Sequence, residues 1–191
     1  MGAEAARSGT IPAPGSPPAA LDDLSEGEFL AVVAPFFENA PRFLAHLAAG
    51  RPYGSAAGLF GGAREIARSM PEDEQVELID AHPRLGAAPA TVSRHSYVEQ
   101  GYDRSGLRPA AEVSATAAEL EELNEAYEER FGFRYCVFVA SRSQSALIPD
   151  MRAALGGDRS DEIERALDAV VDIAADRWAK TMAAASEPGP R

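Results

Sequence analysis

The chain has little cysteine: Cys136 is the single one among 191 residues. An intramolecular disulfide therefore cannot form, which favours a reducing cytoplasm as the location. The apolar runs are far shorter than the roughly 20 residues that a membrane-spanning helix needs. No signal peptide is recognisable near the start, where residues 1–20 are rich in alanine, glycine and proline. These absences predict a cytoplasmic protein without a membrane segment.

Motifs for metals and phosphates are also absent. The three histidines, His46, His82 and His95, are far apart in sequence, and no HExxH, CxxC or EF-hand pattern occurs. No glycine-rich phosphate loop follows a strand, and there is no GxSxG elbow. Cys136 lies in an apolar run, where packing is a better expectation than nucleophilic chemistry. The sequence thus predicts no metal site and no cofactor-binding motif.

Positive charge is scarce relative to negative charge. The formal net charge is −12, which argues against nucleic acid as a partner because phosphate binding depends on clustered lysine and arginine. A small anionic substrate remains compatible with this charge, since such a molecule responds to local fields more than to net charge.

What the sequence does contain is a hydrophobic fraction of 46%, enough for a core, and repeated helical patterns. Capping boxes begin at Ser25 and Thr116, and a proline-containing start precedes a helix that ends at residue 81. One run, residues 135–140, looks like a strand, with a buried extended segment or the start of a helix as equal alternatives. We therefore predict an all-α fold with one compact domain over residues 23–183, a disordered tail over 1–22 and a frayed end over 184–191. The helices are expected at residues 26–34, 42–49, 56–69, 70–81, 116–131, 146–155 and 161–180.

The helix that ends at residue 81 is followed by His82 and Pro83. Proline cannot continue a helix, so His82 is placed at a helix end. A structural interpretation is available, because the helix dipole stabilises a histidine there. Glu99 follows within a short distance, flanked by Ser96 and Gln100, and by itself it would be interpreted as a surface charge. Together these groups form a plausible proton-transfer site.

Several segments resemble the OHCU decarboxylase family, which acts on 2-oxo-4-hydroxy-4-carboxy-5-ureidoimidazoline. The similarity rests on residues 78–86 (LIDAHPRLG) and on the cluster formed by Ser96, Glu99 and Gln100. Further matches, in the expected order, are residues 38–41 (ENAP), 51–53 (RPY), the NxxYxxxFGF block at 124–133, and IAxxR at 173–177. The resemblance covers about residues 24–179.

The resemblance implies an all-α, cofactor-free enzyme, usually a homodimer, that releases CO2 from its substrate to yield S-allantoin in urate degradation. It implies His82 and Glu99 as the catalytic pair, with Pro83, Ser96, Gln100 and Arg177 lining the substrate site. Main-chain groups from Phe133 onward would hold the ring. The candidates in that segment are Phe133, Tyr135, Cys136, Val137 and Phe138.

The implied chemistry suits these residues. An unperturbed histidine has a pKa of about 6.5 and exchanges protons near neutrality, and Arg177 could clamp the substrate by a bidentate contact. One departure is Arg134, which stands where the family usually has proline. It leaves open a related ureido or imidazolone acid as the substrate, and a non-catalytic helical binding module is the remaining alternative.

Overall fold

The computed structural model describes residues 18–103 and 109–186 and confirms the all-α class: helices make up the regular structure in these ranges, and no strand occurs there. The N-terminal half contains α1 (Pro18–Asp22), α2 (Glu26–Val33), the 3-10 helix η1 (Ala34–Phe37), α3 (Pro41–Ala49), α4 (Ala56–Ser69) and α5 (Glu72–Asp80). After it come the 3-10 helix η2 (Pro89–Thr91), α6 (Arg94–Glu99), α7 (Ala110–Phe131), α8 (Gln144–Ala154) and α9 (Arg159–Ser186).

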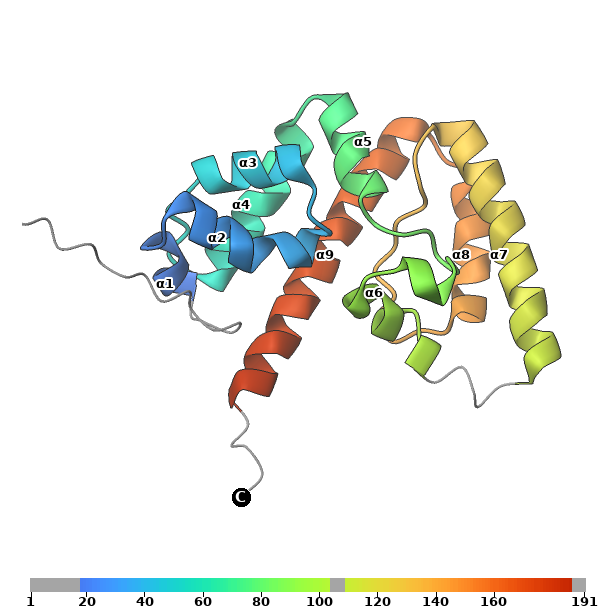
Figure 1. Ribbon diagram of the computed structural model, residues 1–191. Coiled ribbons are helices and arrows are strands. Elements are labelled where there is room, and N and C mark those ends of the chain that lie inside the picture. Colours follow the sequence, from blue (N-terminus) through green and yellow to red (C-terminus); the bar gives the residue numbers. More distant parts are fainter. Residues whose placement is uncertain (1–17, 104–108, 187–191) are drawn as a thin grey trace, which may run out of the picture.

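The long helix α9 runs through the middle of the molecule. Its 28 residues span about 42 Å at roughly 1.5 Å per residue. Helices α1–α4 lie on one side of it and α6–α8 on the other (Figure 1). One face of α9 packs against α4, α5 and η1, where the buried apolar residues Leu167, Val170 and Ala174 join the core. Helix α9 therefore contributes side chains to the core and also lies between the two groups of helices.

Local sequence signals explain several helix ends. The capping box at Ser25 is confirmed, since its hydroxyl accepts from the Glu28 main chain and the Glu28 carboxylate accepts from the Ser25 main chain. The capping box expected at Thr116 is wrong. Thr116 is buried inside α7, which already begins at Ala110, because the alanine-rich run before Thr116 has high helix propensity. The helix ends, as predicted, before Gly132 with its φ of 79°.

The strand-like run at 135–140 forms no strand and has no regular structure up to the turn at residue 140. The last part of the expected N-terminal tail, residues 18–22, has regular structure. Helix α1 occupies residues 18–22, Leu21 is buried, and the Asp22 carboxylate accepts main-chain hydrogen bonds from Tyr53 and Gly54. At the other end α9 continues to Ser186, beyond the predicted frayed boundary. The remaining parts of both expected tails, 1–17 and 187–191, lie outside the described residues.

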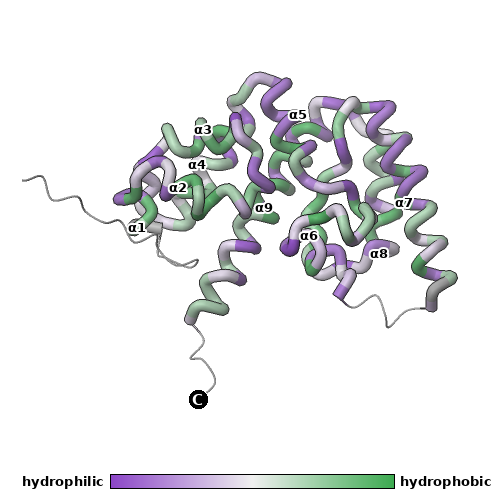
Figure 2. The backbone as a smooth tube through the Cα atoms, in the orientation of Figure 1, coloured by the Kyte–Doolittle hydropathy of each residue, from purple (hydrophilic) through white to green (hydrophobic). Residues whose placement is uncertain are grey.

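The hydropathy of α7 agrees with which of its residues are buried. The C-terminal half of α7, which carries a run of glutamates, is mainly hydrophilic in Figure 2, while its buried side is provided by Leu120, Tyr127 and Phe131. Among the described helices, none has both the length and the apolar character that crossing a membrane would require.

Candidate active site

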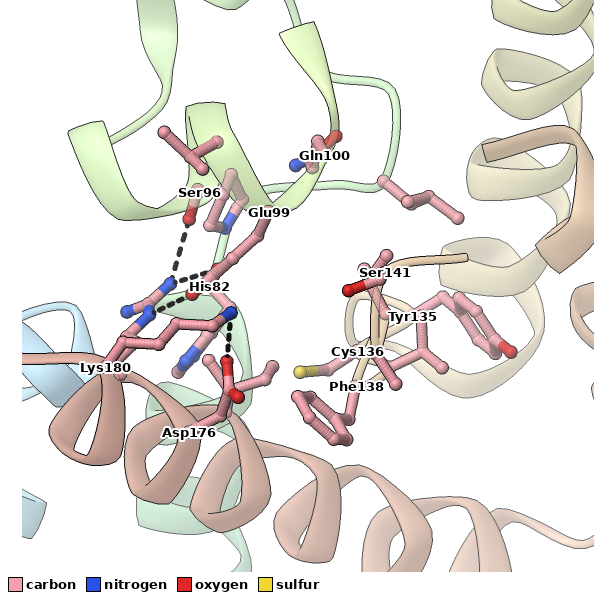
Figure 3. Close-up of a pocket in the computed structure, with 18 of the residues that line it drawn as sticks. His82, Ser96, Glu99, Gln100, Tyr135, Cys136, Phe138, Ser141, Asp176 and Lys180 are labelled. Carbon is pink, nitrogen blue, oxygen red and sulfur yellow. Dashed lines mark hydrogen bonds and ion pairs between the residues drawn. The ribbon is translucent and has the colours of Figure 1, made fainter. Parts of the chain in front are cut away.

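A cavity of about 310 Å³ lies between the end of α5, helix α6, the segment 135–141 and the later part of α9. Figure 3 shows Ser96, Glu99 and Gln100 on one wall, the segment with Tyr135, Cys136 and Phe138 on another, and α9 beneath. The structure thus brings together the residues that the sequence analysis proposed for the site, with one exception. The residues that line it are His82, Pro83, Leu85, Ser96, Val98, Glu99, Gln100, Asp103, residues 135–141, Ile173, Asp176, Arg177 and Lys180.

His82 follows the last turn of α5 and is 4% exposed. Its main-chain N–H donates to Ile79 O at 3.1 Å, and its Nδ1 lies 3.4 Å from Leu78 O. Since a carbonyl oxygen can only accept, this contact places a proton on Nδ1. Nε2 is buried and has no hydrogen-bond partner among the described residues. A neutral His82 therefore presents an unused lone pair on Nε2.

The environment keeps His82 neutral. Burial, together with the positive charge of Arg177, lowers the pKa of His82 to about 4, although Glu38 and Glu99 act in the opposite direction. This corrects the expectation that His82 would exchange protons with an ordinary pKa near neutrality. At neutral pH the group is a base, and a proton placed on it is readily given up.

Arg177 organises the centre of the site. Its side chain is 1% exposed, and each guanidinium nitrogen has a partner within the protein. Nε and Nη2 bind the two Glu99 oxygens at 2.7 and 2.8 Å. Nη2 also donates to Ser96 Oγ at 3.1 Å, and Nη1 donates to Phe36 O at 3.2 Å. The bidentate partner of Arg177 in this structure is thus Glu99, whereas the sequence analysis expected the substrate.

Glu38 is a functional candidate that the sequence analysis missed, although it begins the ENAP segment. It follows η1 in a left-handed conformation with φ of 49°. Its Oε1 accepts from Arg177 Nη2 at 2.8 Å, from Ser96 Oγ at 2.8 Å and from Ser93 Oγ at 2.9 Å. Burial alone would raise the pKa of Glu38, but Arg177 and the two hydroxyl donors outweigh it and hold the pKa below its usual value. Glu38 is therefore a second buried anion beside Arg177.

Gln100 shapes the wall next to His82. Its Oε1 accepts from the Gly86 main chain at 2.7 Å, and its Nε2 donates to Arg84 O at 3.1 Å. Gly86 has a φ of 82°, and a Cβ there would lie 2.9 Å from Leu120, so glycine is required. The amide of Gln100 thus fixes the turn that follows Pro83.

The residues after α7 that were expected to hold the ring differ in whether they line the cavity. Tyr135, Cys136, Val137 and Phe138 line the cavity as predicted. Phe133 does not line it. Its ring packs instead against Tyr127 and Phe131, with ring centroids 5.7 and 6.1 Å apart, because a fully buried aromatic side chain here completes the core.

Cys136 and its neighbours show what holds this segment. Burial raises the pKa of the Cys136 thiol to about 12, so the thiol stays neutral and is a poor nucleophile. Its carbonyl oxygen accepts from Arg165 Nη1 at 2.8 Å, and the Arg165 guanidinium lies over the Tyr135 ring at 4.6 Å. Arg165 therefore supports the cavity wall from behind.

Asp103, Asp176 and Lys180 line the cavity and were also missed. Lys180 and Asp176 form an ion pair at 2.5 Å on α9, and the Lys180 side chain is 64% exposed. The sequence does single out Lys180, because it is the only lysine among the 191 residues. It stands three residues after Arg177, and residues at this spacing share one helix face.

Arg134, the departure from the family pattern, is not among the residues that line the cavity. Its Nη1 donates to Asp80 O at 2.6 Å and to His82 O at 3.1 Å. Its main-chain N–H donates to Asp80 Oδ1 at 2.8 Å. The side chain is therefore engaged by the end of α5.

Fold and site together define a class: an all-α protein with a cavity for a small polar molecule, in which a neutral imidazole stands beside a buried carboxylate–guanidinium network. The chain belongs to the OHCU decarboxylase family, whose family model matches residues 22–179. This confirms the resemblance seen in the sequence.

Relatives agree with the assignment. A 2-oxo-4-hydroxy-4-carboxy-5-ureidoimidazoline decarboxylase from Haloferax volcanii is 25% identical over 171 residues, which is 84% of this chain and 92% of the relative. A uric acid degradation bifunctional protein from Bacillus sp. (strain TB-90) is 26% identical over 81% of this chain, but the chain spans only 30% of that longer relative.

Solved structures agree in fold. A crystal structure of OHCU decarboxylase in the presence of (S)-allantoin has a TM-score of 0.59 and 21% identity, covering 75% of this chain and 92% of the other. A crystal structure of (S)-allantoin synthase has a TM-score of 0.60 and 18% identity, covering 86% and 54%.

Proposed function

We propose that this protein removes CO2 from 2-oxo-4-hydroxy-4-carboxy-5-ureidoimidazoline and yields (S)-allantoin in urate degradation. Family membership supports this reaction, as does the named activity of the Haloferax relative. The observation that carries the proposal is the neutral His82, whose Nε2 has no partner within residues 18–103 and 109–186, in a cavity that also holds the fixed carboxylate of Glu99.

The chemistry requires a proton to be taken and returned. The substrate carries a hydroxyl and a carboxylate on the same ring carbon. When the bond to CO2 breaks, its electron pair is delocalised into the ring. In the proposed mechanism the electron pair moves through the ring C=N bond to nitrogen, which takes up a proton from solvent. His82 Nε2 accepts the hydroxyl proton and later returns it to one face of the ring carbon that bears the ureido group. The lowered pKa of His82 suits the return step, because a protonated His82 is strongly acidic in this site.

Glu99 is the second member of the catalytic pair in this proposal. Arg177 fixes its position, and its carboxylate keeps acceptor capacity for ureido N–H groups. The other lining residues hold the substrate. Pro83 and Ser96 bound the space around His82, Gln100 fixes its wall, and main-chain groups of residues 135–138 face the ring. No cofactor takes part in the proposed reaction.

The substrate alternative that Arg134 left open loses its support. The Arg134 side chain binds the end of α5 and does not line the cavity, so this departure from the family pattern changes no lining side chain. We therefore favour the family substrate over a related ureido or imidazolone acid. A binding module without catalysis would not need the His82, Glu99 and Arg177 combination.

A coupled assay tests the proposal. Urate oxidase and hydroxyisourate hydrolase generate the substrate from urate, this protein is added, and the optical activity of the allantoin is followed. Wild-type protein should yield the S enantiomer, and His82→Gln should reduce the enzymatic rate by roughly 10²- to 10⁴-fold. Racemic product at the uncatalysed rate from folded wild-type protein would exclude the proposed activity.

We also propose a cytoplasmic homodimer. The single cysteine supports a reducing compartment, and the resemblance to the family supports the dimer. Light scattering on the purified chain tests the oligomeric state, and a monomeric mass at micromolar concentration would contradict it.

A further inference from the structure

The end of α5 lacks donors for its last carbonyl groups. In a continuous helix, residue 83 would donate to Ile79 O and residue 84 to Asp80 O. Pro83 has no N–H, and the helix stops before it. Ile79 O accepts instead from the His82 main chain, and Leu78 O is approached by His82 Nδ1. The carbonyls of Asp80 and His82 remain to be satisfied from elsewhere.

Arg134 supplies these donors from another part of the chain. A single guanidinium nitrogen, Nη1, donates to both carbonyl oxygens, at 2.6 Å to Asp80 and 3.1 Å to His82. The connection is reciprocal, because the Asp80 carboxylate accepts the Arg134 main-chain N–H at 2.8 Å. Asp80 is half-buried, and burial raises its pKa although Arg134 acts against the rise. The two segments are thus joined by both main-chain and side-chain groups.

The location of this connection matters for the cavity. Arg134 directly precedes Tyr135, which begins the lining segment 135–141, and His82 lines the same cavity. The connection therefore fixes the catalytic base relative to the wall that would hold the ring. A proline at position 134 would have neither the N–H for Asp80 nor the guanidinium for His82.

We propose that Arg134 is a positioning residue that fixes the main chain of His82, and through it the direction of Nε2, against the substrate-binding segment. This inference rests on the proposed function. Arg134 touches neither Nε2 nor the cavity, so it acts on the geometry of the base and contributes no group to the reaction. Its charge also favours the negative end of the α5 dipole.

The test compares Arg134→Gln, Arg134→Lys and the control Arg130→Gln. Arg130 also donates to a carbonyl, Gly157 O at 3.1 Å, but from an exposed position outside the cavity lining. We expect Arg134→Gln to lower kcat about 10- to 100-fold, because small misplacements of a reacting group have effects of this size, with KM changed less than about twofold. Arg134→Lys keeps the charge and a donor and should recover part of kcat. Arg130→Gln should match the wild type.

A second measurement separates this proposal from the proposed function. Long-range ¹⁵N–¹H spectra of histidine-labelled protein report the tautomer and environment of His82 without any turnover. The His82 resonances should shift in Arg134→Gln and return toward the wild-type position in Arg134→Lys. If wild-type protein proves inactive in the coupled assay, the proposed function fails, yet this spectroscopic comparison still decides whether Arg134 positions His82.

Three outcomes would overturn the proposal. One is an Arg134→Gln variant with wild-type kcat and unchanged His82 resonances. Another is a rise in KM with kcat preserved, which would mean that Arg134 contacts the substrate. The third applies if Arg134→Gln fails to fold: Arg134→Met, which removes the donors and keeps much of the side-chain volume, then decides, and a folded Met variant with both kcat and the His82 spectrum unchanged would show that Arg134 does not position His82.

Discussion

Buried Arg177 and partly buried Glu99 form a bidentate pair, with Nε–Oε1 at 2.7 Å and Nη2–Oε2 at 2.8 Å. The arginine comes from α9 and the glutamate from the last residue of α6, 78 positions apart in sequence. The pair joins the two sides of the cavity and fixes a carboxylate whose position would otherwise depend on a short helix. Glu38 places a second carboxylate on the same guanidinium.

Replacing Arg177 with lysine should damage both stability and activity. An ammonium cannot reproduce the planar fork that binds Glu99, and two partly buried carboxylates would lose hydrogen bonds. We expect a loss of about 3 kcal/mol in the free energy of unfolding and a fall of about 100-fold in kcat/KM. Urea denaturation and the coupled assay measure the two effects.

The matched control is Arg64→Lys. Arg64 also pairs with two carboxylates, Asp168 and Asp172, but on the surface, with a third of its side chain exposed. Pairs of this kind contribute about 1 kcal/mol or less, so this variant should remain close to wild type. Equal losses in the two variants would contradict the special role of the buried pair.

The pH dependence of catalysis should reveal the low pKa of His82. Only the neutral imidazole can act as the base, and burial sets its pKa in the free protein at about 4. We therefore expect kcat/KM to be constant from neutral pH down to about 5 and to fall at lower pH. A bound anionic substrate would favour the charged imidazole and raise the pKa of His82 in the complex. The fall of kcat at low pH should therefore begin at a higher pH than the fall of kcat/KM. A limb in kcat/KM near the ordinary histidine pKa would contradict a neutral buried base.

The low pKa of His82 should also make the free energy of unfolding depend on pH. An unfolded histidine has a pKa of about 6.5, so between that value and 4 the unfolded chain binds more protons at His82 than the folded protein does. Stability conferred by this group is complete above the unfolded pKa and is lost as pH falls, by about 3 kcal/mol at most. His82→Gln should flatten the slope of unfolding free energy between pH 6.5 and about 5. Glu38, whose pKa is lowered, acts only below that window.

Lys180 should govern the capture of the anionic substrate. The Arg177 donors are occupied by the protein, whereas an ammonium has three donors and that of Lys180 is exposed at the cavity. We expect Lys180→Gln to raise KM about fivefold, equivalent to roughly 1 kcal/mol, with kcat nearly unchanged, and to weaken the salt dependence of kcat/KM. Lys180→Arg is the control and should stay near wild type. A salt-independent KM in the wild type would exclude this role.

The sequence predicted those features that depend on local patterns. The helix before His82 was recognisable because acids, a proline start and Pro83 mark its two ends. Gly132 marked the end of α7. The alanine-rich run before Thr116 was misjudged, because a capping box competes poorly with continuous helix propensity when Thr116 is buried by tertiary packing.

The site was less predictable where it depends on long-range pairing. Glu38 meets Arg177 across 139 positions, and the ENAP pattern that it begins does not reveal this partner. The pKa of His82 is likewise a result of burial, which spacing does not report. Phe133 lies within the motif block, but its side chain faces the core, and only the three-dimensional structure separates it from Tyr135.

Helix α9 makes the site sensitive to insertions and deletions as well as to substitutions. Its residues around Leu167 and Val170 pack in the core. Arg177 and Lys180 follow on the same helix and line the cavity. One residue added between Ala174 and Arg177 would rotate everything after it by about 100° and advance it by about 1.5 Å. The cations would then leave the cavity, and Trp178 would lose its packing against Phe36 and Phe60, while the part of the core before the insertion kept its register. Natural length variation should therefore be rare in this stretch of α9 and tolerated beyond Lys180.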